Sequence, residues 1–574
     1  MKVVYRGRNG WRSNAEPMDD GDVLELQSDN WDDFSNQTTF GTLCRINGET
    51  IELGAIKLMI EGYSRTTTLL NELIAGDWNG EFPLLNVNYL SVPNEITFYE
   101  QIAGLLGVDT ALAVAKALRD ASYLVNTVQD AGAIGLTQTT AFNKSLQRER
   151  GSVKAFLDGW KIFARQTMAV LDLGFRFSDV FGSVSNLDLK FQSEGPLPHD
   201  VNVLIGANGA GKSRILHQMV QDWINPPDEV EAVGFVEKPN LSQIVVVSYS
   251  PFEQFPVDLI TTKLQDKNAY RYFGLRGRRS PREDGRPGSI ELTYQVPKRN
   301  AALALLECVA DDQRFRRFSA WAEKLKTVEH VLRFAFEFDF AAVRVGPDGP
   351  ADHYIDDLFE IDDTTIDLTE GPYAGRYVPL RSSQLNALNL GNIREDLIAN
   401  EGVQFFKDGV PVELSSGQRL FSFIVINILG AIRRDSLVLI DEPELFLHPA
   451  LEIQFIDMLK TILDRFNSKA LVATHSEVTV REVPSACVHV LTRTDDGLAV
   501  TKPPFQTFGG DVQRISSYVF NDNTTSKPFE RWIHQNLERF DGAEALLAAL
   551  GDDVNEELII QIRALDTLRE RDVI

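Results

Sequence analysis

The chain has 574 residues, 43% hydrophobic and 24% charged, enough for two or three domains with their own cores. Its net charge of −25 opposes binding to a nucleic-acid backbone, except at a local basic patch. The three cysteines, Cys44, Cys308 and Cys487, are far apart, which excludes a disulfide framework and a zinc signature and favours a reducing cytoplasm. The chain starts without the apolar segment of a signal peptide, and no apolar run could span a bilayer, so we expect no membrane contact.

Residues 1–165 are expected to form a separate α+β region for partner binding or assembly. The turn dipeptide Asn47-Gly48 predicts a hairpin between residues 40–46 and 49–60. Helices are predicted over residues 95–106 and 109–119, with Asn94 and Asp109 as N-caps. Residues 31–34 and 38–40 are either a contact surface or ordinary loop and strand residues, and we favour the second interpretation.

A phosphate-binding loop is predicted at Gly206-Ala-Asn-Gly-Ala-Gly-Lys-Ser213. Strands over 171–177 and 187–191 lead to a buried strand over 201–205, and an amphipathic helix follows the loop. Asn208, Gly209 and Gly211 belong to a backbone that can wrap around phosphates. Lys212 can reach the β- and γ-phosphates of ATP, and the Ser213 hydroxyl can hold Mg²⁺.

Residues 226–399 are expected to form an inserted lid or arm without long heptads. A buried strand over 244–249 precedes Gln254, which is either a Mg²⁺ ligand or a plain loop residue. The alternating patterns over 290–296 and 334–340 predict strands, and residues 301–325 are typical of a helix.

Six arginines lie in a stretch that we expect to be a mobile exposed loop. This stretch is the best candidate for touching DNA or RNA, although a solvated loop or a contact to an acidic partner is the favoured interpretation. The residues are Arg271, Arg276, Arg278, Arg279, Arg282 and Arg286.

Residues 400–495 carry the other half of the predicted catalytic machinery. A hairpin around Asp408-Gly409 leads to residues 414–418 and an apolar helix over 420–432. Ser415, Gly417 and Gln418 belong to a segment that can contact the γ-phosphate of ATP held by a second subunit.

Two buried strands of this half end in polar residues. The strand over 436–440 ends in Asp441-Glu442, and the strand over 470–473 ends in Thr474-His475. Asp441 can hold the Mg²⁺ water shell, and Glu442 can polarise the attacking water. His475 can hydrogen-bond the γ-phosphate and report its presence.

The order of these motifs resembles an ABC-class ATPase, and residues 440–449, Ile-Asp-Glu-Pro-Glu-Leu-Phe-Leu-His-Pro, resemble its OLD/RecF-like branch, which is related to SMC proteins. Ser416 departs from this pattern because it stands where the usual signature has its first glycine. The resemblance implies an α/β ABC-type P-loop core over residues 170–225 and 400–495, with ATP and Mg²⁺. It also implies a homodimer or higher oligomer through shared ATP sites.

Standalone members with an insertion and an N-terminal module resemble the ATPases of bacterial antiphage defence, such as Septu-type and retron-associated systems. This similarity implies a cytoplasmic ATPase that senses a trigger and controls a separate effector, such as an HNH-type nuclease. Three alternatives remain: a DNA-binding SMC/RecF-like repair ATPase, an enzyme with its own cryptic nuclease activity, and a transporter ATPase.

Residues 496–574 are expected to form a C-terminal helical region, with helices over 529–538, 542–550 and 555–568. Asp495-Asp496 lies in a predicted turn, and no acidic strand motif or histidine cluster suggests a nuclease site. We therefore expect any nuclease to be a separate chain.

Overall fold

The computed structural model describes a mixed α/β protein with two compact units, Met1–Gly509 and Gly510–Ile574. The described residues are 1–7, 21–28, 37–46, 49–166, 172–226, 232–260, 262–264, 266–279, 286–315, 323–346, 353, 365–494, 497–520, 528–551 and 553–572.

The N-terminal region is a five-stranded sheet with helices packed against it. Its strands follow the chain order, and only the first two neighbours run parallel. The strands are β1 (Lys2–Tyr5), β2 (Val23–Ser28), β3 (Thr39–Ile46), β4 (Glu49–Ile60) and β5 (Tyr89–Pro93). The helices are α1 (Thr66–Ala75), α2 (Thr97–Leu106), α3 (Val108–Ala117), α4 (Ala121–Tyr123), η1 (Leu124–Val128), α5 (Ala131–Thr137), η2 (Phe142–Leu146) and α6 (Arg150–Phe163). Phe98 and Val114 join the buried strand residues in one core.

The pairing of β3 with β4 confirms the predicted hairpin, while its turn and residues 31–34 lie outside the described residues. Both predicted helices form, but the predicted N-caps are wrong. The N-cap positions of α2 and α3 are Ile96 and Gly107, and neither helix has a side-chain cap, so Asn94 and Asp109 do not fill this role.

Residues 38–40 belong to the sheet rather than to a contact surface. Thr38 and Phe40 are buried, and the Oγ1 of Thr38 lies 2.6 Å from the Oγ of Ser145. This finding confirms the favoured interpretation of this segment as ordinary strand residues.

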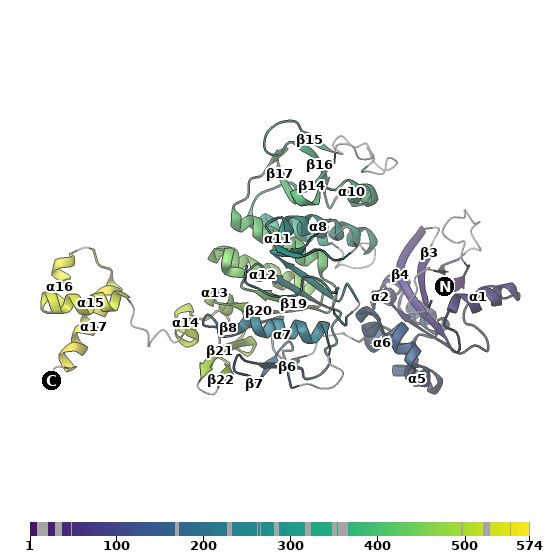
Figure 1. Cartoon of the computed structure of the whole chain (residues 1–574), viewed down its shortest axis with the longest axis horizontal. Coiled ribbons are helices and arrows are strands. Elements are labelled where there is room, and N and C mark those ends of the chain that lie inside the picture. Colours follow the sequence, from purple (N-terminus) through teal and green to yellow (C-terminus); the bar gives the residue numbers. More distant parts are fainter. Residues whose placement is uncertain are drawn as a thin grey trace. The chain divides into compact units, whose positions relative to one another are not determined.

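A seven-stranded sheet forms the centre of the first unit, in the order β11-β10-β19-β20-β8-β21-β22 (Figure 1). All neighbours are parallel except β21 and β22. The strands are β8 (Val201–Gly206), β10 (Gln243–Ser248), β11 (Tyr270–Gly274), β19 (Ser436–Asp441), β20 (Lys469–Thr474), β21 (Val488–Thr494) and β22 (Gly497–Thr501). Because carboxyl ends of parallel strands share one edge, the segments after β8, β10, β19 and β20 meet there.

Helices cover both faces of this sheet, which explains why every residue of β8, β10 and β19 is buried. Figure 1 shows α7 (Lys212–Ile224) on one face, with α11 (Ser416–Ala431) and α12 (Pro449–Arg465) on the other. The shorter helices are η5 (Pro443–Phe446), α13 (Glu477–Arg481) and η6 (Ser485–Cys487). Beyond α7 lies a small antiparallel sheet of β6 (Leu173–Ser178), β7 (Val184–Leu189) and β9 (Gly234–Phe235), which confirms the two strands predicted before the phosphate loop.

The insertion adds a five-stranded antiparallel sheet, a separate pair of strands, β12 and β13, three α-helices and two short 3-10 helices. Its sheet has the order β15-β16-β14-β17-β18, and α8 lies along α11 (Figure 1). The strands are β12 (Arg276–Arg278), β13 (Ile290–Leu292), β14 (Phe340–Val345), β15 (Ile366–Leu368), β16 (Gly375–Leu380), β17 (Val403–Lys407) and β18 (Val410–Pro411). The helices are α8 (Gln295–Phe315), α9 (Lys324–Ala335), η3 (Leu385–Ala387), α10 (Leu390–Asp396) and η4 (Ala399–Glu401).

Two strand predictions in the insertion need correction. The alternation over 334–340 does not mark a strand, because α9 continues to Ala335 and β14 begins only at Phe340. Phe336 and Phe338 are instead buried by edge-on packing against the ring of Phe405. The strand predicted over 290–296 ends at residue 292, because α8 begins three residues later.

The C-terminal unit contains α14 (Val512–Phe520), α15 (Pro528–Phe540), α16 (Ala543–Leu550) and α17 (Glu556–Asp572). The last three confirm the predicted helices, and they share a small core of Ile533, Leu537, Leu546 and Ile562. Within the described parts of both units, no helix combines the length and the apolar character needed to cross a bilayer.

Candidate active site

The phosphate loop joins β8 to α7, as the sequence predicts. Gly209 and Gly211 have φ values of 72° and 99°, a backbone region that favours glycine. Asn208 and Gly209 are exposed, and α7 begins at Lys212, so the free N–H groups of its first turn adjoin the loop. This arrangement suits a chain of phosphates at the positive end of the helix.

Lys212 lies buried at the base of the loop. Its Nζ donates to the carbonyl oxygens of Gly206, at 3.1 Å, and Ala207, at 3.5 Å, and lies 2.7 Å from the Nε2 of His475. Burial lowers the pKa of Lys212, although three nearby carboxylates oppose this shift. The amine is therefore held where the loop, the acidic strand end and His475 meet.

Ser213 and Asp441 form the pair expected to hold Mg²⁺. The Ser213 hydroxyl donates to Oδ1 of Asp441 at 2.8 Å, and the Oγ of Ser248 lies 3.5 Å from the other carboxylate oxygen. Burial raises the pKa of Asp441 to about 7, an effect that the Ser213 hydrogen bond opposes. A hydroxyl beside a buried carboxylate is the protein donor set that Mg²⁺ takes together with phosphates and water. The residues present therefore fit the ion.

Glu442 has an unusual backbone and a fixed neighbour. Its φ of 49° and ψ of 56° are left-handed, and its N–H donates to the carbonyl of Ala473 at 2.8 Å. The carboxylate lies 3.5 Å from the Nε2 of His475, which lowers the pKa of Glu442. The carboxylate is thus ionised near neutral pH and can accept a proton from a water molecule.

Glu444 is a site residue that was not predicted from the sequence. Its Oε1 accepts a hydrogen bond of 2.5 Å from the backbone N–H of His475, and its Oε2 is buried without a hydrogen-bond partner among the described residues. Glu444 therefore positions the segment that carries His475. Its role could have been predicted from its position, two residues after Glu442 at the end of a buried strand.

The segment 414–418 begins α11 and does not contact the phosphate loop through any described hydrogen bond. Ser415 and Gln418 form a reciprocal capping box, in which each side chain bonds the other's backbone N–H. Gln418 also donates to the carbonyl of Ala335 at 3.0 Å, and a Cβ at Gly417 would lie 3.0 Å from the carbonyl oxygen of Phe446. Ser415 is exposed, so its roles toward ATP stay a prediction that requires a second subunit.

Gln254 follows β10 near the same edge of the sheet. Its side chain is exposed, and its backbone interacts with the ring of His217 on α7. The Mg²⁺ role of Gln254 stays a prediction.

A second feature that the sequence analysis missed is the cover that β21 and β22 give to the phosphate loop. Arg493 donates to the carbonyl of Gly209 at 2.5 Å, and a Cβ at Gly206 would lie only 2.4 Å from the carbonyl oxygen of Leu491. Phe181, 76% exposed at the turn between β6 and β7, lines a hollow beside the loop. No local sequence pattern predicts these contacts, because the segments are far apart in the chain.

The arginine stretch is not the exposed loop expected from the sequence. Residues 270–274 and 276–278 are strands, and 280–285, with Arg282, lie outside the described residues. Three of these arginines form ion pairs. Arg276 lies 3.4 Å from Glu253, Arg278 lies 2.5 Å from Asp258, and Arg279 lies 2.5 Å from Glu291. Arg271 and Arg286 are exposed. This pairing reduces the local positive charge on which nucleic-acid binding was expected to depend.

Parts of this chain are similar to known proteins. Residues 256–481 match the family described as an AAA domain, putative AbiEii toxin, type IV toxin–antitoxin system. The chain is also 24% identical over 534 residues to protein ea59 of Escherichia phage lambda, and the match covers 89% of each chain. Two solved structures are similar. The SMC head domain from Thermotoga maritima is 12% identical, and the match covers 59% of this chain and 100% of that chain, with a TM-score of 0.27. An SMC head bound to the C-winged helix domain of ScpA is 11% identical, and the match covers 58% of this chain and 98% of that chain, with a TM-score of 0.28.

The family match includes the acidic strand end and His475, while the phosphate loop precedes it in the chain. The fold brings all three to the same edge of one parallel sheet. These residues therefore form a P-loop ATPase site, and residues 256–481 around it are similar to the AAA domain of the matched family.

Proposed function

We propose that the protein is an ATP-driven switch that controls a separate effector, such as an HNH-type nuclease, in bacterial antiphage defence. The description of the matched family as a putative toxin of a toxin–antitoxin system supports this role. A relative in a bacteriophage is compatible with it. The three buried free thiols, Cys44, Cys308 and Cys487, support a cytoplasmic setting.

In this proposal each residue of the site has one task in ATP hydrolysis. Lys212 and the loop N–H groups bind the β- and γ-phosphates, and Ser213 and Asp441 hold Mg²⁺, which neutralises charge that develops on the phosphates. Glu442 accepts a proton from the attacking water, and His475, fixed by Glu444, orients Glu442 and senses the γ-phosphate.

ATP acts between subunits in this proposal. Ser415, Gly417 and Gln418 begin a helix whose first turn is partly exposed, so a second subunit can bring its γ-phosphate there. Differential affinity of ATP for the paired state would then drive pairing.

The observation that carries the switch proposal is the contact at the other end of the same helix. Arg433 and Arg434 follow α11 directly, and they form ion pairs with Glu95, at 2.9 Å, and Glu100, at 2.5 Å. Both glutamates belong to the N-terminal region. One rigid helix therefore links the segment proposed to touch ATP with the region proposed to touch the effector.

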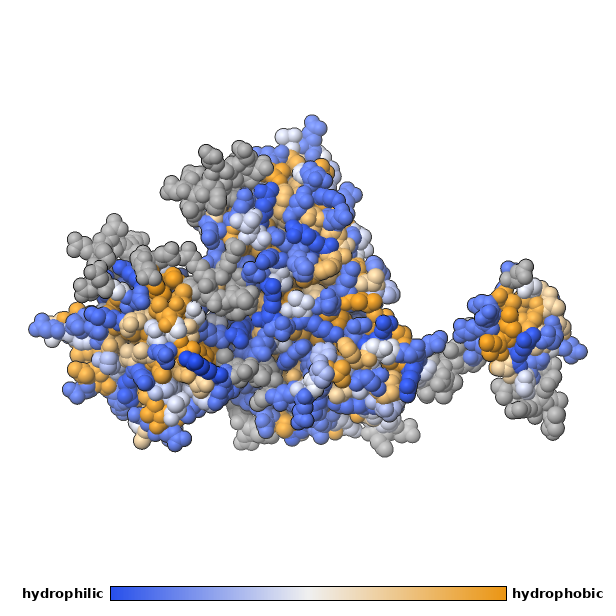
Figure 2. Space-filling view, turned by 180° about the vertical axis from the view of Figure 1, so that it is seen from behind, coloured by the Kyte–Doolittle hydropathy of each residue, from blue (hydrophilic) through white to orange (hydrophobic). Residues whose placement is uncertain are grey.

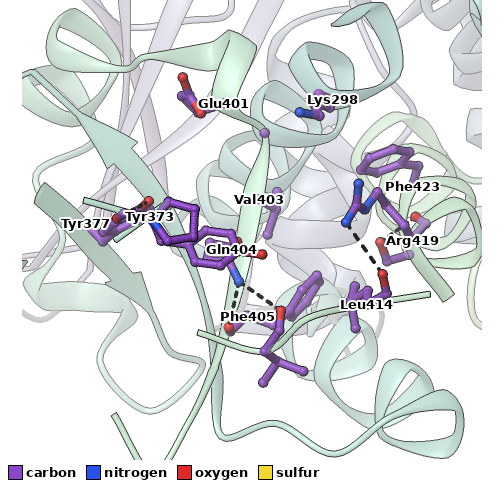
Figure 3. Close-up of a pocket in the computed structure, with 14 residues that line it drawn as sticks. Lys298, Tyr373, Tyr377, Glu401, Val403, Gln404, Phe405, Leu414, Arg419 and Phe423 are labelled. Atoms are coloured by element: carbon purple, nitrogen blue, oxygen red, sulfur yellow. Dashed lines mark hydrogen bonds between the residues drawn. The ribbon is translucent and has the colours of Figure 1, made fainter. Parts of the chain in front are cut away.

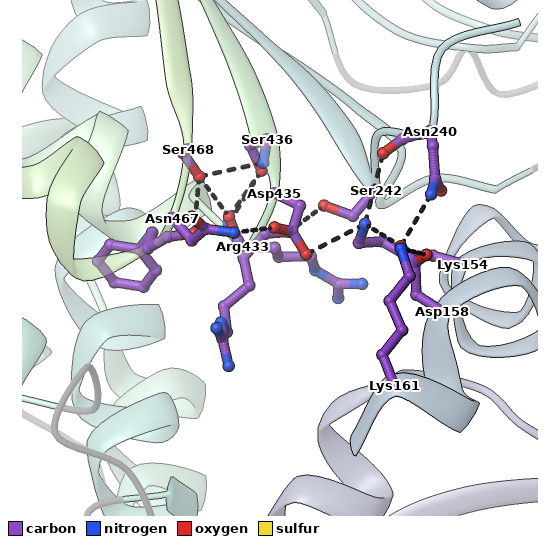
Figure 4. Close-up of polar contacts among 12 residues, drawn as sticks. Lys154, Asp158, Lys161, Asn240, Ser242, Arg433, Asp435, Ser436, Asn467 and Ser468 are labelled. Carbon is purple, nitrogen blue, oxygen red and sulfur yellow. Dashed lines mark hydrogen bonds and ion pairs between the residues drawn. The ribbon is translucent and has the colours of Figure 1, made fainter. Parts of the chain in front are cut away.

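A buried ion pair strengthens this link at the turn between α11 and β19 (Figure 4). The Nζ of Lys154, on α6, lies 3.2 Å from Asp435 and 2.9 Å from Asp158. Asn240 donates to Asp158 at 2.8 Å, and Lys161 pairs with the same carboxylate at 2.7 Å. Burial alone would raise the pKa of Asp158, but the two lysines outweigh burial and lower it. Movement at the base of the acidic strand would thus reach the N-terminal region.

The N-terminal region also offers a surface for an effector. On the face shown in Figure 2, hydrophobic groups interrupt the hydrophilic surface of this region. Large apolar side chains exposed in the region are Tyr63, Ile74, Leu85, Val128 and Leu157. In this proposal some of these side chains are covered when the effector binds, because burial of apolar surface favours association.

A plaque assay with the native neighbouring genes tests the defence role. We expect phage plating to fall with the wild-type chain and to recover with Lys212→Ala, while Arg394→Ala, an exposed change on α10, should protect like the wild type. Equal plating on wild-type and Lys212→Ala cells would refute the defence role. Hydrogen–deuterium exchange tests the switch: ATP should change protection of α2 and α6 in the Glu442→Gln chain but not in Lys212→Ala.

A further inference from the structure

A second cavity lies between the insertion and the first turns of α11, apart from the phosphate loop. Its volume is about 250 Å³. Figure 3 shows the side chains that reach it from four segments: Lys298 from α8, Tyr373 and Tyr377 from β16 and the residues before it, Phe405 from β17 and Arg419 from α11.

The walls of this cavity are rich in aromatic rings. Tyr377, Phe405 and Phe423 are buried, and Tyr373 is half-buried at the edge. The hydroxyl of Tyr377 donates to the carbonyl of Tyr373 at 3.0 Å, which fixes the two tyrosines relative to each other. Fixed flat rings favour a planar aromatic ligand over a flexible aliphatic one.

The charges at this cavity favour an anion. Among the described residues, Lys298 forms no ion pair, and the side chain of Arg419 makes a polar contact only to the carbonyl of Leu414, at 3.5 Å. The acid in the lining, Glu401, lies 3.4 Å from Arg344. Two cations without partner carboxylates therefore face the cavity of a protein whose net charge is −25.

We propose that this cavity binds a small planar anion of the nucleotide class, at a site separate from the ATP site. The base stacks on Tyr373, the half-buried ring at the edge of the cavity, and the phosphate pairs with Lys298 and Arg419. The volume lies near the lower limit of ligand pockets, about 300 Å³, which favours a single nucleotide over a larger ligand.

Such a ligand would act on the segment that the proposed switch uses. Arg419 lies one helical turn after Ser415 and contacts the carbonyl of Leu414, so a phosphate that holds Arg419 also restrains the start of α11. This effect rests on the proposed function, whereas binding itself does not.

The binding test uses AMP and the full chain with Lys212→Ala, which weakens the phosphate loop as a competing site. Isothermal titration should show one AMP per chain. Adding Lys298→Ala or Tyr373→Leu should weaken binding at least tenfold, while Tyr373→Phe, which keeps the ring, should bind AMP equally well. Lys326→Ala is the matched control, because this lysine is 63% exposed on α9 and lies outside the cavity lining.

Two results would overturn the proposal: no AMP binding to the Lys212→Ala chain, or binding that both pocket changes leave intact. If Tyr373→Leu unfolds the protein, the surface change Lys298→Ala decides alone. A 5′-phosphorylated dinucleotide tests the source of the nucleotide. Tighter binding than AMP supports a strand end as the ligand, and weaker binding supports a free mononucleotide. Full phage protection by a Lys298→Ala chain that has lost AMP binding would refute only the effect on the switch.

Discussion

Replacing Lys154 with methionine tests whether a buried ion pair joins the N-terminal region to the ATPase core. The amine lies between Asp158 and Asp435, and the three side chains are only 4%, 6% and 1% exposed. Methionine keeps most of the length of the lysine side chain and removes its charge. Two buried carboxylates would then lose their common cation.

The structure sets the expected size of this effect. Removal of one partner from a buried pair costs about 3–5 kcal/mol. Asp158 keeps its contacts to Lys161 and Asn240, and Asp435 still accepts a hydrogen bond of 2.6 Å from Asn467. We therefore expect a loss at the lower end of this range, about 3 kcal/mol. The double change Lys154→Met/Asp435→Asn removes both charges and should recover much of the loss.

Thermal unfolding and limited proteolysis of the full chain measure this effect. Lys154→Met should lower the Tm and expose the segment around α6 to protease, whereas the control Lys161→Met, at a site 28% exposed, should change stability by less than about 1 kcal/mol. Equal effects of the two single changes would refute the reasoning. So would a double variant as unstable as Lys154→Met.

Four further outcomes are expected. The Lys212→Ala chain should stay folded and lose most of its ATP affinity in an equilibrium binding assay. The Glu442→Gln chain should bind ATP but fail to hydrolyse it in a single turnover. An unchanged hydrolysis rate in the Glu442→Gln chain would mean that another residue has the catalytic role. A mixed dimer of Lys212→Ala and Ser415→Arg chains should keep roughly half of the ATPase activity unless the sites are strictly coupled, and a normally active Ser415→Arg homodimer would exclude shared sites. Burial raises the pKa of Asp120 to about 7, so its ionisation opposes folding, at a cost of at most about 4 kcal/mol, as pH rises from about 4 to 7. Asp120→Asn should remove part of the fall in Tm between pH 5 and 8, and Asp130→Asn, a change at a half-buried N-cap, should not.

The sequence predicted the parts of the fold that depend on local pattern. The strands β8, β10, β19 and β20 are short apolar runs bounded by polar residues, and the glycine loop follows one of them, so both their existence and the site at their ends could be inferred. The contact of Ser213 with Asp441 follows from the shared edge of parallel strands.

Features fixed by distant contacts could not be inferred. Phe336 and Phe338 alternate like strand residues, yet Phe405 decides their packing. The prediction that Arg276 and Arg278 lie in an exposed loop was wrong, because both form ion pairs with acids about twenty residues earlier in the chain. The predicted N-caps of α2 and α3 were wrong, because Ile96 and Gly107 hold those positions and neither helix has a side-chain cap.

The place of β8 in the sheet has a consequence for synthesis of the protein on the ribosome. Both neighbours of β8 are late segments, β20 and β21, so the strand that carries the phosphate loop emerges long before either can pair with it. Until then an apolar strand with two open edges is exposed, which is a condition that promotes aggregation. Nascent chains that stop before β21 should therefore depend on chaperones, and the nucleotide site should be among the last parts of the first unit to form.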